Sequence, residues 1–408
     1  MSSELNPVTP EGASFVELCE NHLAEVGGRA AEHDRDGSFP LEELQALQES
    51  KAMAACVPVE LGGLGVRSLH DLVVGINRLA RGDGSLAIAV NMHAAACWLL
   101  TFLGPRFTAR GNQPVADAMA GLLAAAGSGV VFGLAGSEPG ADFLHPLTTA
   151  SRCGDGWILN GRKSFVTSSP VAGLFVVRCR VEERNGPQQG FAMVARSLPG
   201  VAVKETWDAL GMRASASHDL VLHDCRLPET AVLVDSQSWG AWSRVLLLAS
   251  IAGIGGIIGV GLGLAEAARD FAMEFVTTRR RAPSNRLLAE RYPTQQRIAD
   301  IQIDLAAARA MLTRTYAAVD AYLGDGEDQA VEDLHRVHAE VQSAKAFVQR
   351  KAIDIVDGCL AISGGSGYLN RSPLSRLYRD VRAGPFMQPL SPSEAPEYIG
   401  KVTLGLPP

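Results

Sequence analysis

The sequence predicts an α+β protein in which a small β domain separates two helical regions. Residues 11 to about 128 show the apolar spacing of helices. From Val130 to about Val234 the pattern changes to short, alternating, β-rich segments separated by turn residues. Long helical stretches return from Trp239 onward. The domains expected from these two changes are 1–129, 130–235 and 236–408.

The composition is that of a globular protein that does not bind nucleic acid or membranes. Hydrophobic residues make up 47% of the 408-residue chain and charged residues 20%, which excludes a fibrous or disordered protein. The formal net charge of −7 gives no basic field for nucleic acid or anionic lipid. Seven cysteines without a C-x-x-C pair indicate neither a zinc site nor a disulfide framework. With a polar, acidic N-terminus that does not resemble a signal peptide, the expected location is the cytoplasm.

The N-terminal region is predicted to consist of packed helices. Phe15, Leu18 and Leu23 mark the apolar stripe of its first helical stretch. Two alanine-rich stretches follow at 87–104 and 115–127, after a Pro- and Gly-rich turn in VPVELGGLGV. His93 stands in the first alanine-rich stretch and is expected to be a core residue.

The central region is predicted to form short strands. Asp155-Gly156 and Asn160-Gly161 are typical hairpin-turn pairs, and each is expected to reverse the chain. The expected strands are 130–136, 148–153, 157–167, 173–181, 189–196, 201–207 and 218–227.

The C-terminal region begins with an unusually apolar helix. Residues 245–265 contain no charge and are long enough to cross a bilayer. However, Gly255, Gly259 and Gly263 are four residues apart, which allows another helix to approach one side closely. Since the helical pattern also continues beyond residue 265, we expect a buried bundle helix and no membrane span. Breaks in the later helices are expected at RAPSNR, LGDGEDQ and SGGSGYLNRSP.

Common catalytic signatures are absent from the sequence. It contains no Walker loop, no G-x-S-x-G elbow and no H-E-x-x-H, and its nine histidines lack ligand spacing, so no metal is expected. Several other motifs occur together and in order: VPVELGGLG, RGDGSLA, SEPGA at 137–141, LNGRKSFVT at 159–167, WDALGMR at 207–213, ISGGSGY at 362–368 and YRDVR at 378–382.

These motifs resemble those of the acyl-CoA dehydrogenase superfamily over nearly the whole chain. The resemblance implies an N-terminal helical domain, a central small β-barrel or sandwich and a C-terminal four-helix bundle. It also implies FAD held between the β domain and the bundle, in a homotetramer or homodimer.

The resemblance further implies which residues hold the FAD. The aromatic-x-Thr element beside the flavin ring is Phe165-Val166-Thr167, in which the aromatic face packs on the ring and the hydroxyl supports its reduced form. Arg281 corresponds to the family arginine on the diphosphate, although it could also be a solvated residue of the run Arg279–Arg281. The implied cofactor-binding residues are Leu134, Ser137, Phe165, Val166, Thr167, Arg281, Gly364 and Gly365, the two glycines reaching the FAD of a neighbouring subunit.

At the position of the family's catalytic base the sequence departs from the pattern. Relatives that dehydrogenate acyl thioesters place a Glu nine residues after the Arg of R-D-A, and here that position is Gln388. A neutral amide does not accept the α-proton. The long-helix position used by other branches lies in 251–255, which has no carboxylate. Glu394, six residues after Gln388, is the alternative base.

The substrate-binding positions are also changed. Phe143 stands where the family has a serine that contacts the thioester arm, and Ile254 where many members have an arginine for CoA. A different substrate or a different reaction is therefore indicated, unless these two regions are misaligned.

Three hypotheses follow. The first is a diverged flavoenzyme of specialised metabolism whose small acyl or keto-acid substrate is free or linked to CoA or a carrier protein. Its reaction would be α,β-dehydrogenation, decarboxylation or oxygenation, and relatives of this fold also hydroxylate amines or aromatics. The second is an ordinary acyl-CoA dehydrogenase whose base is Glu394. The third is a non-enzymatic member. The electron acceptor is expected to be electron-transfer flavoprotein or O2.

Overall fold

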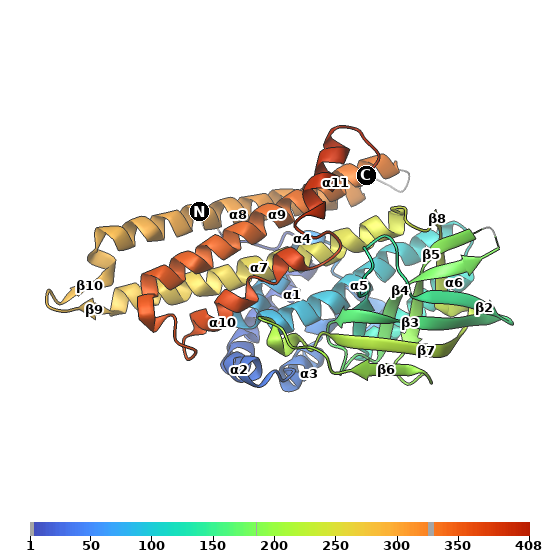
Figure 1. Cartoon of the computed structure of the whole chain (residues 1–408), viewed down its shortest axis with the longest axis horizontal. Helices are drawn as coiled ribbons and strands as arrows, with labels where there is room; N and C mark the ends of the chain where they lie inside the picture. Colours follow the sequence, from blue (N-terminus) through green and yellow to red (C-terminus); the bar gives the residue numbers. More distant parts are fainter. Residues whose placement is uncertain (1–3, 185, 325–329) are drawn as a thin grey trace.

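The computed structural model of the chain describes residues 4–184, 186–324 and 330–408. Long helices form one end of the molecule, and a sheet covered by helices α5 and α6 forms the other (Figure 1). The expected order of helices, sheet and helices is confirmed.

The N-terminal helices pack around a shared apolar core. Phe15, from the predicted stripe, is fully buried, and its ring lies against Gly75. Side chains cap the starts of three of these helices: Thr9, Ser68 and Asp83 each accept a hydrogen bond from the first turn. The helices are α1 (Pro10–Asn21), α2 (Leu23–Asp36), α3 (Leu41–Glu49), α4 (Leu69–Gly82), α5 (Gly84–Ala109) and α6 (Gln113–Gly127), with short 3-10 turns at Ala52–Ala54 and Val59–Leu61.

His93 is a buried core residue, as expected. Its Nδ1 accepts a hydrogen bond of 3.0 Å from the backbone N–H of Phe132, so it joins α5 to the first strand. Burial lowers the pKa of His93 to about 4, and the imidazole is therefore neutral at physiological pH.

The described strands form one mixed eight-stranded sheet. Seven of them follow the order β6-β7-β3-β2-β4-β5-β8, and β1 pairs in parallel with β4. The expected central β domain is confirmed, and in it β4 pairs with three strands, β1, β2 and β5. Strand β8 lies outside the expected segments. The strands are β1 (Phe132–Ala135), β2 (Thr149–Cys153), β3 (Gly156–Val166), β4 (Leu174–Glu183), β5 (Gly186–Ala195), β6 (Val201–Lys204), β7 (His218–Pro228) and β8 (Val232–Ser238).

Of the two predicted hairpin turns, only the first is present. The chain reverses between β2 and β3, where Cys153 pairs with Gly156. The turn prediction at Asn160-Gly161 is wrong, because both residues lie inside β3 at a register shift against β7. There Asn160 exchanges hydrogen bonds with Asp224 across the two strands, which accommodates the irregularity as a bulge.

The three long helices of the C-terminal region, α7, α8 and α9, lie side by side along the long axis of the molecule (Figure 1). The breaks expected at RAPSNR and SGGSGYLNRSP are confirmed, whereas residues 325–329 of the expected break LGDGEDQ lie outside the described residues. The helices are α7 (Arg244–Thr278), α8 (Tyr292–Gly324), α9 (Val331–Ser363), α10 (Pro373–Asp380) and α11 (Glu394–Thr403), and a small hairpin of β9 (Arg280–Arg281) and β10 (Arg286–Leu287) joins α7 to α8.

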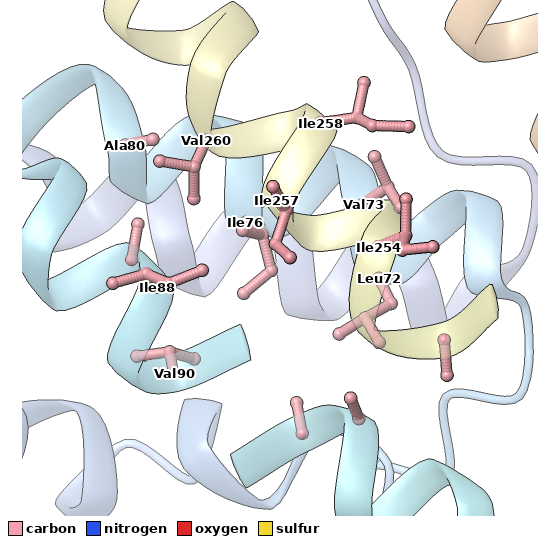
Figure 2. Close-up of a cluster of buried hydrophobic side chains, with 14 of the residues drawn as sticks. Leu72, Val73, Ile76, Ala80, Ile88, Val90, Ile254, Ile257, Ile258 and Val260 are labelled. Carbon is pink, nitrogen blue, oxygen red and sulfur yellow. The ribbon is translucent and has the colours of Figure 1, made fainter. Parts of the chain in front are cut away.

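Helix α7 is the central core helix, as its glycine spacing predicted. A side chain on Gly259 would meet the backbone O of Val73 at 2.9 Å, and one on Gly263 would meet the backbone O of Asn77, both in α4. Around this close approach, isoleucine and valine side chains of α4, α5 and α7 interdigitate (Figure 2). Within the described residues, α5 and α7 are the two helices long and apolar enough to cross a membrane, and both are mostly buried in this core, which accounts for their apolar sequences.

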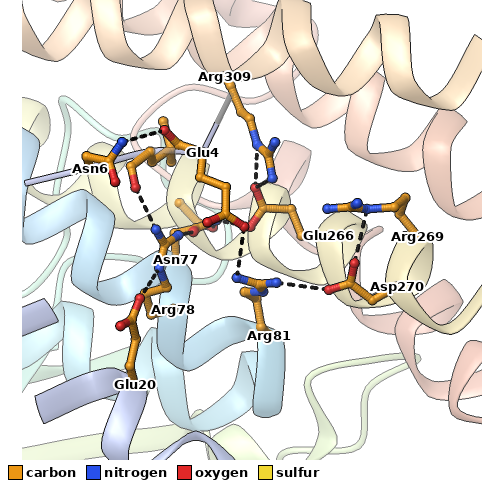
Figure 3. Close-up of polar contacts among 12 residues, drawn as sticks. Glu4, Asn6, Glu20, Asn77, Arg78, Arg81, Glu266, Arg269, Asp270 and Arg309 are labelled. Atoms are coloured by element: carbon orange, nitrogen blue, oxygen red, sulfur yellow. Dashed lines mark hydrogen bonds and ion pairs between the residues drawn. The ribbon is translucent and has the colours of Figure 1, made fainter. Parts of the chain in front are cut away.

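Buried charges tie α4, α7 and α8 together (Figure 3). Glu266 of α7 is fully buried and accepts hydrogen bonds from Arg309 Nε at 2.7 Å and from Asn77 Nδ2 at 3.1 Å. Because a buried carboxylate is tolerated only when it is paired, these contacts specify how the three helices meet.

Candidate functional site

A cavity of about 510 Å³ lies between the sheet and helices α5 and α7. Residues of β1, β4 and β5 line it on one side, and α5 and α7 line it on the other. Two loop segments complete its wall: residues 207–212 before β7 and residues 382–389 after α10.

Most of the cavity lining is apolar, and its charged groups are cationic. The hydroxyl, guanidinium and amide side chains in the lining are Ser137, Thr167, Arg178, Ser215, Ser217, Ser250, Arg379, Arg382 and Gln388. Among the described residues that line the cavity there is no aspartate, glutamate or histidine. The cavity therefore favours neutral and anionic ligands over cations.

An aromatic surface on the sheet side is open to the cavity. Phe165, the penultimate residue of β3, has a positive φ of 59° and is 64% exposed, although it is a large apolar residue. Its ring meets Trp207 edge-on, with 6.0 Å between centroids and an interplanar angle of 86°. An exposed aromatic face at a cavity wall suits a flat aromatic ligand.

Next to this surface lies a row of hydroxyl groups. Thr167 Oγ1 is 2.9 Å from Ser217 Oγ, which is 2.8 Å from Ser215 Oγ. Ser137, at the end of β1, also lines the cavity. Together they offer donors and acceptors to the polar edge of a ring that packs on Phe165. This combination of a flat apolar face and a polar edge fits a flavin.

The 207–212 segment is held in place by the residues that end α10. Asp380 accepts a 2.6 Å hydrogen bond from the N–H of Met212, and Gly211 lies so close to the Arg379 carbonyl that no side chain would fit. Burial raises the pKa of Asp380 to about 6. The WDALGMR and YRDVR motifs thus pack against each other, although they lie far apart in the sequence.

The loop that carries Gln388 is fixed by a buried lysine. Lys345 of α9 donates from Nζ to the carbonyl of Leu390 at 3.0 Å and also to that of Met387. Burial lowers the pKa of Lys345 to about 8, so it is mainly protonated at pH 7. Two anchored carbonyls, one on each side of Gln388, keep this residue at the cavity wall.

Most of the residues predicted for the cofactor and the substrate line this one cavity. They come from segments far apart in the sequence and are Leu134, Ser137, Phe143, Phe165, Thr167, Ile254 and Gln388. Val166 does not line it, because alternation along β3 turns its side chain into the core of the sheet.

Three predicted residues lie elsewhere in the chain. Arg281 is exposed on the β9–β10 hairpin, and Gly364 and Gly365 follow the end of α9. The hairpin lies at the opposite end of the molecule from the sheet (Figure 1). Gly364 has φ 58° and ψ −146°, a conformation that favours glycine.

Glu394 is also absent from the lining of the cavity. Its carboxylate accepts a 2.8 Å hydrogen bond from the N–H of Ser391 at the start of α11. This is a local cap, and it gives no support to Glu394 as the catalytic base.

Several polar lining residues were not predicted from the sequence, among them Arg178 and Ser250. Arg178 lies within a strand pattern, and Ser250 is the one hydroxyl in the first turns of the apolar helix α7. Arg178 donates to the carbonyl of Phe143 and to Gln189 Oε1 at 2.9 Å, and its guanidinium lies 4.2 Å from the centre of the Phe143 ring. A basic residue directly after the apolar run Leu174–Val177 was the available signal for Arg178.

Models of one protein family match the chain from end to end. The acyl-CoA dehydrogenase N-terminal domain matches residues 12–106, the middle domain residues 132–225 and the C-terminal domain residues 256–388.

The relatives of this chain include amino sugar nitrososynthases. The amino sugar nitrososynthase DnmZ of Streptomyces peucetius is 32% identical over 98% of this chain and 95% of its own. The crystal structure of a nitrososynthase from Micromonospora carbonacea var. africana is 33% identical, with a TM-score of 0.90 over 100% of both chains. The structure of KijD3 with FMN and dTDP-3-amino-2,3,6-trideoxy-4-keto-3-methyl-D-glucose is 33% identical, with a TM-score of 0.88 over 98% of this chain and 95% of that one.

The family models, these relatives and the shape of the cavity agree on the cofactor. A relative of the same fold binds FMN, and the cavity presents the aromatic face and hydroxyl edge that a flavin needs. The chain belongs to the acyl-CoA dehydrogenase family and is a flavin-dependent oxidoreductase, consistent with FAD as its cofactor.

Proposed function

We propose that this protein oxygenates the amino group of a nucleotide-linked amino sugar, with reduced flavin and O2 as co-substrates. The names of its relatives support this reaction class. The observation that carries the proposal is the absence of any carboxylate among the described residues that line the cavity.

Removal of an α-proton from an acyl thioester needs a base at the cavity wall. A proton acceptor must lie within hydrogen-bond reach of the carbon, and a carboxylate performs this role well. Gln388 occupies the wall instead, and its amide has no useful basicity. The cavity is thus poorly equipped for acyl-CoA dehydrogenation.

Oxygenation of an amine has a different requirement. The lone pair of the amine nitrogen must be free to react, so the amine must be in its neutral form. The cavity lowers the pKa of a bound amine, since it is largely apolar and holds a cation. Burial lowers the pKa of Arg178 to about 10, so its guanidinium still carries a positive charge at pH 7. Protonation of a nearby amine is therefore opposed, and the neutral, nucleophilic form is favoured.

The overall reaction balances without a protein base. An amine, O2 and two electrons with two protons give a hydroxylamine and water, and a bound flavin brings the electrons to O2. In this reaction Phe165 and Trp207 hold the ring, and the hydroxyl row orients its polar edge. The apolar walls of α5 and α7 exclude water from the reacting groups.

The rest of the flavin site is assigned to a second copy of the chain. Arg281, Gly364 and Gly365 do not line the cavity of their own chain, so their contact with the cofactor requires a neighbouring subunit. We place the protein in the cytoplasm as a homodimer or homotetramer in specialised metabolism, and reduced flavin is regenerated by a separate reductase.

The test is oxygenation of the amino sugar nucleotide bound by KijD3, with FAD and a flavin reductase present. The expected result is O2 uptake coupled to a hydroxylamine or nitroso product, detected by mass spectrometry. The contrary result is no oxygenated product, together with anaerobic bleaching of the flavin by an acyl-CoA such as butyryl-CoA.

A further inference from the structure

A buried serine–histidine pair lies directly behind the cavity wall. Ser250 of α7 lines the cavity, and its Oγ is 2.6 Å from Nε2 of His338 on α9. His338 is fully buried, and the rings of Trp242 and Tyr398 each lie 5.0 Å from it. The proposed oxygenation mechanism does not use this pair.

Ser250 keeps an acceptor site whichever partner donates. The Gln342 amide lies 3.2 Å from the same Nε2 atom of His338, so this nitrogen is enclosed by two polar side chains. Nε2 of the neutral imidazole accepts from the Ser250 hydroxyl in one tautomer and donates to it in the other. In both tautomers at least one lone pair of Ser250 Oγ is left for a ligand in the cavity.

The imidazole remains neutral, as this arrangement requires. Burial, with smaller contributions from His335 and Lys345, lowers the pKa of His338 to about 3. The other titratable groups around it are Tyr398, whose pKa burial raises, and His335, whose Nδ1 lies 2.8 Å from the Tyr398 hydroxyl. None of these groups is an anion at pH 7 that would stabilise a protonated His338.

The position of Ser250 separates it from the groups assigned to the flavin. The hydroxyl row of Thr167, Ser215 and Ser217 belongs to the sheet side of the cavity. On the opposite side, Ser250 is the sole polar side chain among the described lining residues of α5 and α7. A ligand between the flavin and these helices meets one hydrogen-bond acceptor there.

His338 belongs to a polar seam on α9, consisting of His338, Gln342, Lys345 and Gln349, all of which are buried. Lys345 holds the Gln388 loop, and Gln349 Nε2 donates to the Ile257 carbonyl of α7 at 2.8 Å. Both contacts thus reach segments that line the cavity, namely the loop around Gln388 and helix α7. The Nδ1 of His338 has no hydrogen-bond partner in the described part of the chain. Burying an unpaired polar atom costs stability, so packing alone does not explain a histidine at this position.

We propose that Ser250, oriented by His338, accepts a hydrogen bond from the substrate's amino group and holds it at the cavity wall, an assignment that rests on the proposed amine oxygenation. Ser250 is thus a substrate-binding residue, and His338 is a positioning residue. An N–H donor and a hydroxyl acceptor form a neutral hydrogen bond, worth about 1 kcal/mol or about fivefold in affinity.

The test compares two ligands that differ in the amino sugar. Calorimetry measures binding of the KijD3 amino sugar nucleotide and of dTDP, which lacks the whole amino sugar with its amine, to the flavin-loaded protein. Ser250→Ala is expected to weaken binding of the amino sugar nucleotide about fivefold and to leave binding of dTDP unchanged. The matched control is Ser343→Ala, which removes an α9 hydroxyl that donates to Ala339 O and does not line the cavity.

The role of His338 is tested by a double-mutant cycle. His338→Leu is expected to weaken binding of the amino sugar nucleotide in the wild type and to have no further effect in the Ser250→Ala background. Equal weakening of both ligands, or equal effects in both backgrounds, means a structural role and overturns the assignment. If Ser250→Ala does not fold, Ser250→Cys keeps the size and offers only a weak acceptor for the same comparison.

The outcomes separate this inference from the proposed function. If the wild type oxygenates the amino sugar nucleotide and Ser250→Ala binds and oxygenates it equally well, the inference fails alone. If the wild type neither oxygenates that nucleotide nor binds it more tightly than dTDP, the proposed function fails and the inference falls with it.

Discussion

At the residue scale, Gln388 stands at the cavity wall where the sequence resemblance places a catalytic carboxylate. Gln388→Glu would place a carboxylate in a wall that has none among its described residues. We expect the variant to retain flavin and to gain reduction by butyryl-CoA at about 100-fold the rate of the wild type, because a base is now present. Anaerobic stopped-flow absorbance of the flavin measures this rate.

Gln388→Asn is the matched control, because it changes the length of the side chain and adds no charge. Its flavin should be reduced no faster than that of the wild type. If Gln388→Glu is also inert towards acyl-CoA thioesters of several chain lengths, residue 388 does not occupy the position of the family base.

The lowered pKa of His338 predicts how the stability of the folded protein depends on pH. Its pKa is about 3 in the folded protein and 6.5 in an ordinary environment, so the unfolded chain binds the extra proton between these values. Stability is therefore lost as the pH falls through this window, by about 2 kcal/mol between pH 6.5 and pH 5.

The melting temperature of the wild type and of His338→Gln, measured at pH 7 and pH 5, tests this dependence. The wild type should lose more on acidification, because the glutamine does not titrate. His93 and His335 are present in both proteins, so their contributions cancel in the comparison. Identical losses in the two proteins would show that His338 is already protonated in the folded state.

The sequence predicted the parts of the site that lie in local motifs. Ser137, Phe165 and Gln388 each stand in a recognisable segment, and all three line the cavity. The contact between Ser250 and His338 joins residues 88 positions apart, and neither residue has a motif around it. Such a pair depends on how α7 and α9 pack, which a pattern along the chain does not encode.

At the element scale, the glycines of α7 are not equivalent. A methyl group at Gly263 would collide with α4, whereas one at Gly253 would meet no atom within 4 Å. Gly263→Ala should destabilise the protein by about 1–3 kcal/mol, because the helices must move apart. Gly253→Ala should be neutral or stabilise it by up to about 1 kcal/mol, because alanine favours the helix.

Thermal unfolding of these two variants compares the same substitution in the same helix. Equal melting temperatures would show that the spacing of Gly255, Gly259 and Gly263 does not determine how closely α4 approaches. Binding is not the readout here, because Gly253 lines the cavity.

Hydrophobic periodicity along the sequence predicted most of the helices and strands, because the side chains of each element face one dominant environment. The strands alternate and the long helices bury continuous apolar faces, so their patterns are clear. The failure at Asn160-Gly161 has a physical cause, since an Asn-Gly pair suits a bulge as well as a turn. Only the partner strand, through Asp224, decides between the two.

At the scale of the whole molecule, the proposed flavin contacts lie at two ends of one chain. The sheet end holds Phe165 and Thr167 in the cavity, and the hairpin end carries Arg281 (Figure 1). The domain limits at residues 129 and 235 remain predictions. The α4–α7 packing and the hydrogen bond from Asn77 to the buried Glu266 join the first and last of these regions into one core.

This separation predicts complementation between two defective subunits. Arg281→Gln removes the proposed diphosphate contact and leaves the cavity intact, whereas Phe165→Ala removes the aromatic face and leaves the hairpin intact. Each variant alone should bind FAD about tenfold more weakly, since each loses one strong contact with the cofactor. In a mixed oligomer, one site combines an intact cavity with an intact Arg281 from the other subunit. Co-expression with two different tags, followed by tandem purification, should therefore recover FAD at near wild-type affinity in part of the sites. FAD binding in the mixed oligomer that equals the average of the two separate variants would place Arg281 outside the neighbouring subunit's site.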